Sequence, residues 1–296
     1  MKIKSLLIFC SIFLLACAEE KTPSFTDSSL YVFGDSLSDI GNANIASGGL
    51  LPDKNYYQGR FSNGPLYVEK LAVSLNTQIK PSRSYGTNFA FAGATSVAVS
   101  AQVFNYSENV AGQADPEAVY ILWTGANDLL GILQTDAATV DVTDVISIIR
   151  QSILDLSNIG AENIIILNQV NIGKLPRTMA LETQVPGTVL AADTLTRSFN
   201  TALDAMLDLL ETEESIVTIR FDVFTLFEQV MDDPVSFGLS NITEACYVRD
   251  ETRLELSGNE TICTSPSEYL FWDSIHPTSA AHEIIFQRIQ SLLDGV

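Results

Sequence analysis

Four apolar runs divide the sequence into regular segments. They lie at residues 30–33, 119–123, 163–170 and 216–221, and each has the length of a buried strand. Between them lie segments in which apolar residues recur with helical spacing. The pattern therefore predicts strands that alternate with helices.

The segment between the second and third runs shows the helical spacing most clearly. Its apolar face consists of Val145, Ile146, Ile149, Ile153 and Leu156. Gly160 follows, at a place where glycine commonly ends a helix. Because alternation of this kind favours a parallel sheet with helices on both faces, we expect an α/β fold of three layers. At 296 residues and 46% hydrophobic content, the chain can bury the core of one domain, which we place at residues 29–296.

The first residues do not fit this pattern. Lys2 and Lys4 precede an apolar run at 6–15, which predicts a secretory signal over residues 1–16. The end of the run, "LLAC", resembles a bacterial lipobox, which would make Cys17 the lipid-modified first residue of the mature protein. An ordinary cleaved signal and an uncleaved anchor are the alternatives. We expect residues 17–28 to form a tether.

The charge of the chain limits its partners. The formal net charge is −20, and removal of residues 1–16 leaves 36 acids against 14 bases, so it becomes 14 − 36 = −22. Nucleic acid is excluded on this ground. Anionic lipid headgroups also repel such a chain, so attachment to a membrane would depend on the lipid on Cys17.

Cysteine usage agrees with export. Cys10 lies in the signal and Cys17 carries the lipid, which leaves Cys246 and Cys263. In an oxidising compartment we expect these two to form a disulfide. A metal site is the alternative, but the sequence has no CxxC spacing and only two histidines, so we expect no metal.

Candidate chemistry lies after the first and second predicted strands and in a segment beyond the last one. In open α/β sheets, functional residues gather beyond the carboxyl ends of the strands. Ser36 follows the first run in "GDS", Asn127 follows the second in "TGAND", and Asp273 stands three positions before His276 in "FWDSIHP". Thr278 or Ser279 would then cap a final helix.

The two histidines have different surroundings in the sequence. His282 lies inside the apparent closing helix, and "HEIIF" lacks the second histidine of a zinc-protease HExxH, so we interpret His282 as structural. His276 lies in a loop with a carboxylate nearby, as a general base oriented by a third group requires. Ser36, His276 and Asp273 then supply a nucleophile, a base and an orienting group.

A serine nucleophile also needs donors for the oxyanion. Amides at the start of a helix after Ser36 would supply one, the amide of Gly93 in "NFAFAGATS" another, and the side chain of Asn127 a third. Each residue has a structural alternative: Ser36 or Asn127 as a helix cap, Gly93 as a turn, Asp273 as a surface acid. We expect Asp35 and Asp39 to make local hydrogen bonds only.

Four blocks of sequence, in order, carry a resemblance to a known family. "FGDSLSDIGN", "NFAFAGATS", "TGAND" and "DSIHP" resemble the conserved blocks of the GDSL or SGNH hydrolases, from about residue 30 to the C-terminus. The resemblance implies a flavodoxin-like α/β/α fold, Ser36 as nucleophile, His276 and Asp273 as base and orienting group, and Ser36, Gly93 and Asn127 as oxyanion donors. It implies acyl transfer without a metal or organic cofactor.

The resemblance also suggests a substrate class. "GRFSNGPLYVEKLA" at 59–72 is similar to the branch of lipases, phospholipases and glycerophospholipid acyltransferases. We therefore expect an exported lipoprotein, at the outer membrane or cell surface, that hydrolyses or transfers acyl groups of lipid esters. A carbohydrate acetylesterase and a non-catalytic exported binding lipoprotein are the alternatives. If sorting follows the usual Gram-negative pattern, Ala18 after Cys17 favours the outer membrane.

Overall fold

The centre of the protein is a sheet of four parallel strands. The computed structural model describes residues 25–134, 141–250 and 256–295. The strands are β1 (Leu30–Gly34), β2 (Val119–Trp123), β3 (Asn163–Leu167) and β4 (Ile219–Phe221), in the order β1-β2-β3-β4. The predicted parallel sheet is confirmed.

Two of the predicted strands are longer than the observed ones. The chain leaves the sheet at Gln169 because the side chain of Asn200 bonds both backbone groups of that residue: Asn200 Oδ1 accepts from the Gln169 amide and Asn200 Nδ2 donates to its carbonyl, each at 2.8 Å. Before β4, the Ile216 amide donates to the carbonyl of Leu210 and closes the preceding helix. Apolar content alone did not show these competing hydrogen bonds.

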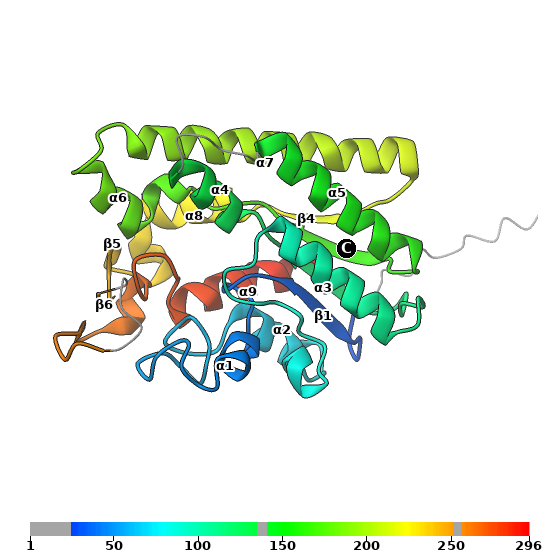
Figure 1. Ribbon diagram of the computed structural model, residues 1–296, viewed down its shortest axis with the longest axis horizontal. Helices are drawn as coiled ribbons and strands as arrows, with labels where there is room; N and C mark the ends of the chain where they lie inside the picture. The colour runs from blue at the N-terminus through cyan, green and yellow to red at the C-terminus, as the bar shows by residue number, and fades with distance from the viewer. Residues whose placement is uncertain (1–24, 135–140, 251–255, 296) are drawn as a thin grey trace, which may run out of the picture.

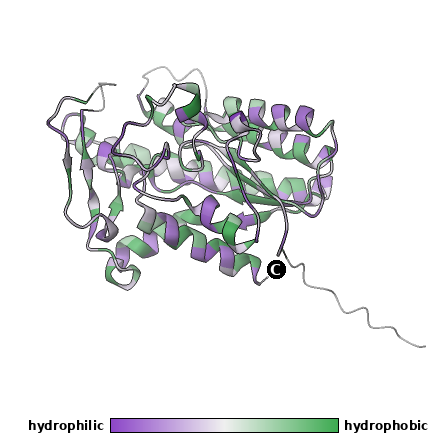
Figure 2. Cartoon of the chain, turned by 90° about the horizontal axis from the view of Figure 1, so that it is seen from below, coloured by the Kyte–Doolittle hydropathy of each residue, from purple (hydrophilic) through white to green (hydrophobic). Residues whose placement is uncertain are grey.

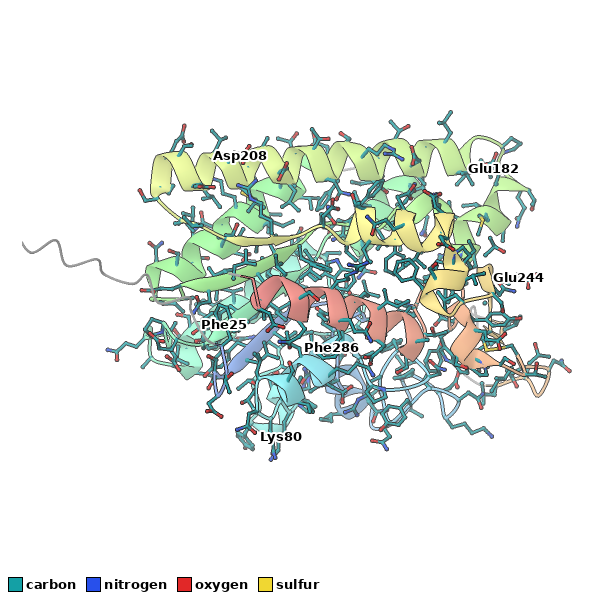
Figure 3. All side chains as sticks on the ribbon, turned by 180° about the vertical axis from the view of Figure 1, so that it is seen from behind. Phe25, Lys80, Glu182, Asp208, Glu244 and Phe286 are labelled. Atoms are coloured by element: carbon teal, nitrogen blue, oxygen red, sulfur yellow. A yellow bond between two sulfur atoms is a disulfide. The ribbon has the colours of Figure 1, made fainter. Side chains whose placement is uncertain are left out.

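Helices cover both faces of the sheet, as predicted (Figure 1). On one face α3 (Ser96–Asn109), α5 (Val142–Asn158) and α7 (Thr188–Glu214) pack side by side. On the other, α2 (Tyr67–Ser74) packs against α9 (Ser279–Leu293), and Figure 3 shows α9 from that side. The outer helices carry alternating polar and apolar residues around their axes (Figure 2), as expected of helices with one buried face.

The helix α5 forms where its sequence predicts. Its buried residues include all five members of the predicted apolar face. The side chain of Asp141 accepts a hydrogen bond from the amide of Asp144 at 3.0 Å and caps the first turn. Gly160 has a φ of 103° just after the helix, a conformation that favours glycine.

The carboxyl end of β1 is fixed from several sides. Gly34 contacts β2 so closely that a Cβ would lie 2.5 Å from the carbonyl oxygen of Trp123. The Gln102 side chain from α3 accepts from the Gly34 amide at 2.9 Å and donates to its carbonyl at 2.8 Å. On the other edge of β1, residues 87–91 run alongside, and the Phe91 amide donates to the Gly34 carbonyl. The end of β1 thus lies between β2 on one edge and residues 87–91 on the other.

The remaining elements lie around this frame. The shorter helices are α1 (Asn42–Ala46), α4 (Ala126–Gln134), α6 (Pro176–Glu182) and α8 (Val223–Asp232), with 3₁₀ helices at Ser82–Ser84, Ile172–Lys174, Pro234–Phe237 and Pro266–Glu268. Two small sheets pair β5 (Asn241–Ala245) with β8 (Tyr269–Phe271), and β6 (Tyr247–Val248) with β7 (Thr261–Ile262). A disulfide joins Cys246 to Cys263.

The packed part of the chain begins earlier than predicted. Phe25 (labelled in Figure 3) is only 7% exposed and belongs to the core. The Asp27 amide donates to the carbonyl of Leu75 at 2.8 Å. Residues 25–28, which we expected in the tether, therefore pack with the domain because an aromatic side chain anchors them. The predicted signal and Cys17 lie outside the described residues, and none of the helices that the structure describes is long and apolar enough to span a membrane.

Candidate active site

Ser36 lies in a tight turn directly after β1. Its side chain is 9% exposed, and its hydroxyl lies 2.9 Å from Nε2 of His276. Residues 35–41 form turns, and α1 begins only at Asn42. The helix expected after Ser36 is therefore present but begins six positions later, so the alternative reading of Ser36 as its cap is wrong.

Asp39 takes the capping role instead. Its carboxylate accepts from the amides of Gly41, Asn42 and Ala43 at the start of α1, at 2.6–3.0 Å. It also accepts from the amide of Ala92 at 2.9 Å. The bonds to α1 are the local ones that we expected of Asp39, whereas the bond to Ala92, which joins this turn to the loop that contains Gly93, is long-range and was not expected.

Asp273 and His276 form a compact unit between β8 and α9. Oδ1 of Asp273 accepts the amides of Ile275 and His276 at 2.8 and 2.7 Å, and Oδ2 lies 2.7 Å from Nδ1 of His276. The loop ends at Thr278, whose hydroxyl accepts from the amide of Ala281 and caps α9, as predicted. Asp273 is 3% exposed, so it is not the surface acid of the alternative reading.

The surroundings of Asp273 keep its carboxyl group ionised. Burial by itself would raise the pKa of Asp273. The nearby charge of His276 and hydrogen bonds from His276 and Tyr56 outweigh burial and hold the pKa below its usual range. An ionised carboxylate at this place favours a proton on Nδ1 of His276, which leaves Nε2 to accept one from Ser36.

Asn127 reaches the site from the first turn of α4, after β2. Its Nδ2 donates to the carbonyl of Ala94 at 3.0 Å and lies 3.4 Å from Oδ2 of Asp35. Gly93, next to Ala94, has a φ of 79° and open space on its Cβ side. The structure thus places Asn127 beside Asp35, on the wall of the same pocket as Ser36, and links it to the Gly93 loop through Ala94.

Asp35 brings a second buried carboxyl group to the site. Its Oδ1 accepts the amide of Leu37 at 3.0 Å, the local bond that we expected. Burial raises the pKa of Asp35 to about 6, and the Leu37 amide and the charge of His276 offset only part of that effect. The proximity of this carboxyl to Asn127 was not visible in the sequence.

An apolar pocket opens beside Ser36. Ser36, Asn127 and Leu37 lie on its wall with residues that follow β2, β3 and β4. Its volume is about 40 Å³, which makes it narrow. The apolar side chains that line it are Leu37, Trp123, Ala126, Leu130, Val170, Ile172, Leu175, Phe227, Phe271, Ile275 and Pro277.

Two aromatic residues of the site were missed by sequence reasoning. Tyr56 donates a hydrogen bond to Oδ2 of Asp273 at 2.5 Å, and the ring of Phe61 lies 5.2 Å from that of His276. Both come from a loop between α1 and α2 that has no helical or strand periodicity. A loop of this kind gives no local signal of what it contacts.

The second histidine lies in the core, as predicted. His282 in α9 is fully buried, and its ring stacks on that of Tyr67 with 6.0 Å between centroids. Burial lowers its pKa to about 3. No group of three or more His, Cys, Asp or Glu side chains that could hold a metal ion occurs in the described part of the chain.

A serine, an imidazole and a carboxylate in hydrogen-bonded series at the strand ends of an α/β sheet are typical of serine hydrolases. The family model described as GDSL-like Lipase/Acylhydrolase matches residues 30–289. The chain therefore belongs to the GDSL lipase/acylhydrolase family, a family of carboxylic ester hydrolases.

Two known proteins are similar to this chain along most of its length. The chain is 26% identical to the phosphatidylcholine-sterol acyltransferase of Aeromonas hydrophila, over 94% of this chain and 93% of that protein. It is 28% identical to a GDSL esterase/lipase of Arabidopsis thaliana, over 92% and 87%.

Solved structures share the fold. An alpha/beta hydrolase from the metagenome of Lake Arreo superimposes with a TM-score of 0.53 at 13% identity, covering 93% of this chain and 98% of that one. An acetyl xylan esterase from Geobacillus stearothermophilus gives 0.50 at 15% identity, covering 90% and 95%.

Proposed function

We propose that this protein cleaves carboxylic esters through an acyl-enzyme formed on Ser36. The observation that carries the proposal is the unbroken series from the Ser36 hydroxyl to His276 at 2.9 Å and from His276 to Asp273 at 2.7 Å. A hydroxyl is a weak nucleophile until a base takes its proton, and this series supplies the base and its orienting group.

The reaction has two steps. Ser36 Oγ attacks the ester carbonyl as Nε2 of His276 takes its proton, and the same proton then passes to the departing alcohol as the carbon–oxygen bond breaks. Water attacks the acyl-enzyme with His276 again as base, and Ser36 recovers its proton. An alcohol in place of water would give acyl transfer. Neither step requires a metal or an organic cofactor.

Three donors would stabilise the oxyanion in both steps. They are the backbone amides of Ser36 and Gly93 and the side-chain amide of Asn127. The Ala94 carbonyl, which accepts from Asn127 at 3.0 Å, supports this assignment because it fixes the orientation of the side-chain amide.

The first carbons of the substrate's acyl group would occupy the narrow apolar pocket beside Ser36, and the rest of a long chain would lie outside it. Its wall lacks charged side chains other than Asp35, so an alkyl chain gains free energy there and a sugar does not. We therefore propose lipid acyl esters, including phospholipids, as substrates. The similarity to a phosphatidylcholine-sterol acyltransferase supports this choice over carbohydrate acetates.

Mutation of the proposed base tests the mechanism. His276→Ala should lower kcat/KM for a short-chain ester by at least about 10³-fold. His282→Gln is the matched control, because it removes the other histidine and leaves the site intact. Ser36→Ala should abolish covalent labelling by a fluorophosphonate. A folded His276→Ala protein with near-normal turnover would contradict the mechanism, and absence of labelling in the wild type would favour a non-catalytic binding protein.

Substrate class requires a comparison of esters. Phospholipid vesicles, p-nitrophenyl esters of increasing chain length and acetylated xylan should be offered to the same preparation. We expect the highest kcat/KM on the lipid and longer-chain esters. A preference for acetylated xylan would instead favour a carbohydrate acetylesterase.

A further inference from the structure

The carboxylate of Asp273 accepts a hydrogen bond from a residue far away in the sequence. Oη of Tyr56, 217 positions earlier, donates to Oδ2 at 2.5 Å. The same oxygen faces Nδ1 of His276, while Oδ1 accepts two backbone amides. Four donors thus surround the two oxygens, which is the number that an ionised carboxylate can accept. Of these four donors, only the Tyr56 hydroxyl comes from outside the 273–276 loop.

The position of Tyr56 is fixed by the residues around it. Its ring packs edge-on against Tyr247 and Trp272, with centroid distances of 5.5 and 6.4 Å. Its amide donates to the carbonyl of Asp53 at 3.1 Å. The rings of Tyr247 and Trp272 in turn stack on each other, with 5.4 Å between their centroids. A hydroxyl held from several directions loses little entropy when it donates, so its bond to Asp273 is preorganised.

We propose that Tyr56 is a positioning residue for the reaction, and that it acts through Asp273 on His276. This inference rests on the proposed function of His276 as the base. The Tyr56 bond would act in two ways: it fixes the plane of the carboxylate that orients the imidazole, and it withdraws negative charge from Oδ2. Loss of the bond would let the imidazole move and would leave more negative charge on Oδ2, so His276 would hold its proton to higher pH.

Tyr56→Phe removes the hydroxyl that bonds Asp273 and keeps the ring. Two further groups are coupled to His276 by charge, Asp35 after β1 and His282 in the packed helix α9, and both are present in wild type and variant alike. Phe61 packs against the ring of His276 without a titrating group. A difference in pH dependence between wild type and a Tyr56 variant therefore reports the bond to Asp273.

The test is Tyr56→Phe in the full-length protein, with Tyr247→Phe as the matched control. Both variants lose one hydroxyl from the same aromatic cluster, but the Tyr247 hydroxyl contacts Asp53 and Asn55 and not Asp273. Initial rates on a p-nitrophenyl ester should be divided by the amount of Ser36 that a fluorophosphonate labels at saturation, so that misfolded molecules are not counted. We expect kcat of Tyr56→Phe to fall about tenfold at unchanged KM. The acid limb of kcat/KM should move up by about half a pH unit, and Tyr247→Phe should show neither change.

Three results would overturn the inference: kcat of Tyr56→Phe within twofold of wild type, a lower kcat with an unmoved acid limb, or the same changes in Tyr247→Phe. The first would show that the bond has no effect, and the others that only packing matters. His276→Ala is assayed in parallel to separate two kinds of failure. If it is inactive while Tyr56→Phe is normal, only the inference fails; if it is active, the proposed function fails as well.

Discussion

His282 should make the folded protein sensitive to acid. Its ring is fully buried, Nδ1 accepts a long hydrogen bond of 3.4 Å from the Tyr67 amide, and Nε2 has no hydrogen-bond partner among the described residues. Burial lowers the pKa of His282 from 6.5 to about 3. The folded state therefore excludes a proton that the unfolded chain binds readily.

The size and direction of the effect follow from this difference in pKa. Above pH 6.5 both states are neutral at His282 and stability is unaffected. As the pH falls below 6.5 the unfolded chain takes up the proton, and each further unit costs about 1.4 kcal/mol until the folded state also binds it near pH 3. At pH 4.5 the loss amounts to about 3 kcal/mol, a large part of the stability of an ordinary domain.

The assay compares wild type with His282→Gln by urea denaturation at pH 7.5 and 4.5. Glutamine does not titrate, so any packing cost of the substitution appears at both pH values and cancels in the comparison. Asp35, whose raised pKa has the opposite effect on acid stability, is present in both proteins and cancels too. We expect wild type to lose about 3 kcal/mol more than the variant between the two pH values. Parallel losses would refute the reasoning.

Three further predictions concern other parts of the chain. Replacement of both Cys246 and Cys263 by serine should lower the free energy of unfolding by about 3 kcal/mol, because it opens a loop with a sequence separation of 17 residues. Calorimetry would measure this loss, and an unchanged melting temperature would contradict the prediction. Wild-type kcat/KM should rise by up to about fourfold for each methylene of the acyl chain until the pocket is filled. Leu130→Trp should remove that rise and leave kcat/KM for acetyl esters unchanged. If the variant shows the same dependence on chain length as wild type, the acyl group lies elsewhere. If Cys17 carries a lipid, Cys17→Ser should release the protein from membranes without loss of turnover, and equal retention of both proteins on fractionation would argue against the anchor.

The sheet and the larger helices were predictable because their signals are local. An apolar run of suitable length predicts a strand without reference to distant residues, and the apolar face of α5 is visible within seventeen residues of sequence. The ends of the strands were less predictable. At Gln169 the backbone leaves the sheet because the side chain of Asn200, 31 positions later, bonds both its amide and its carbonyl.

The residues of the candidate site also divide into those that the sequence predicts and those that it does not. Ser36, Asp273 and His276 lie in recognisable blocks, and the structure brings them into contact. Tyr56 was not predictable, since its partner lies 217 positions away and a tyrosine in an unpatterned loop has many possible roles. The burial of Asp35 was also hidden, because it depends on how α4 and the 273–276 loop cover the end of β1.

The separation of Ser36 from His276 has a consequence for biosynthesis. The nucleophile and the base of the proposed mechanism are 240 residues apart. A ribosome needs about 10–50 s to synthesise that length of chain, so for this period a nascent molecule carries the serine without its base. Such a molecule would lack esterase activity even if its first strands had already folded. Esters that meet the growing chain would thus be protected from hydrolysis by the order in which the two residues are made.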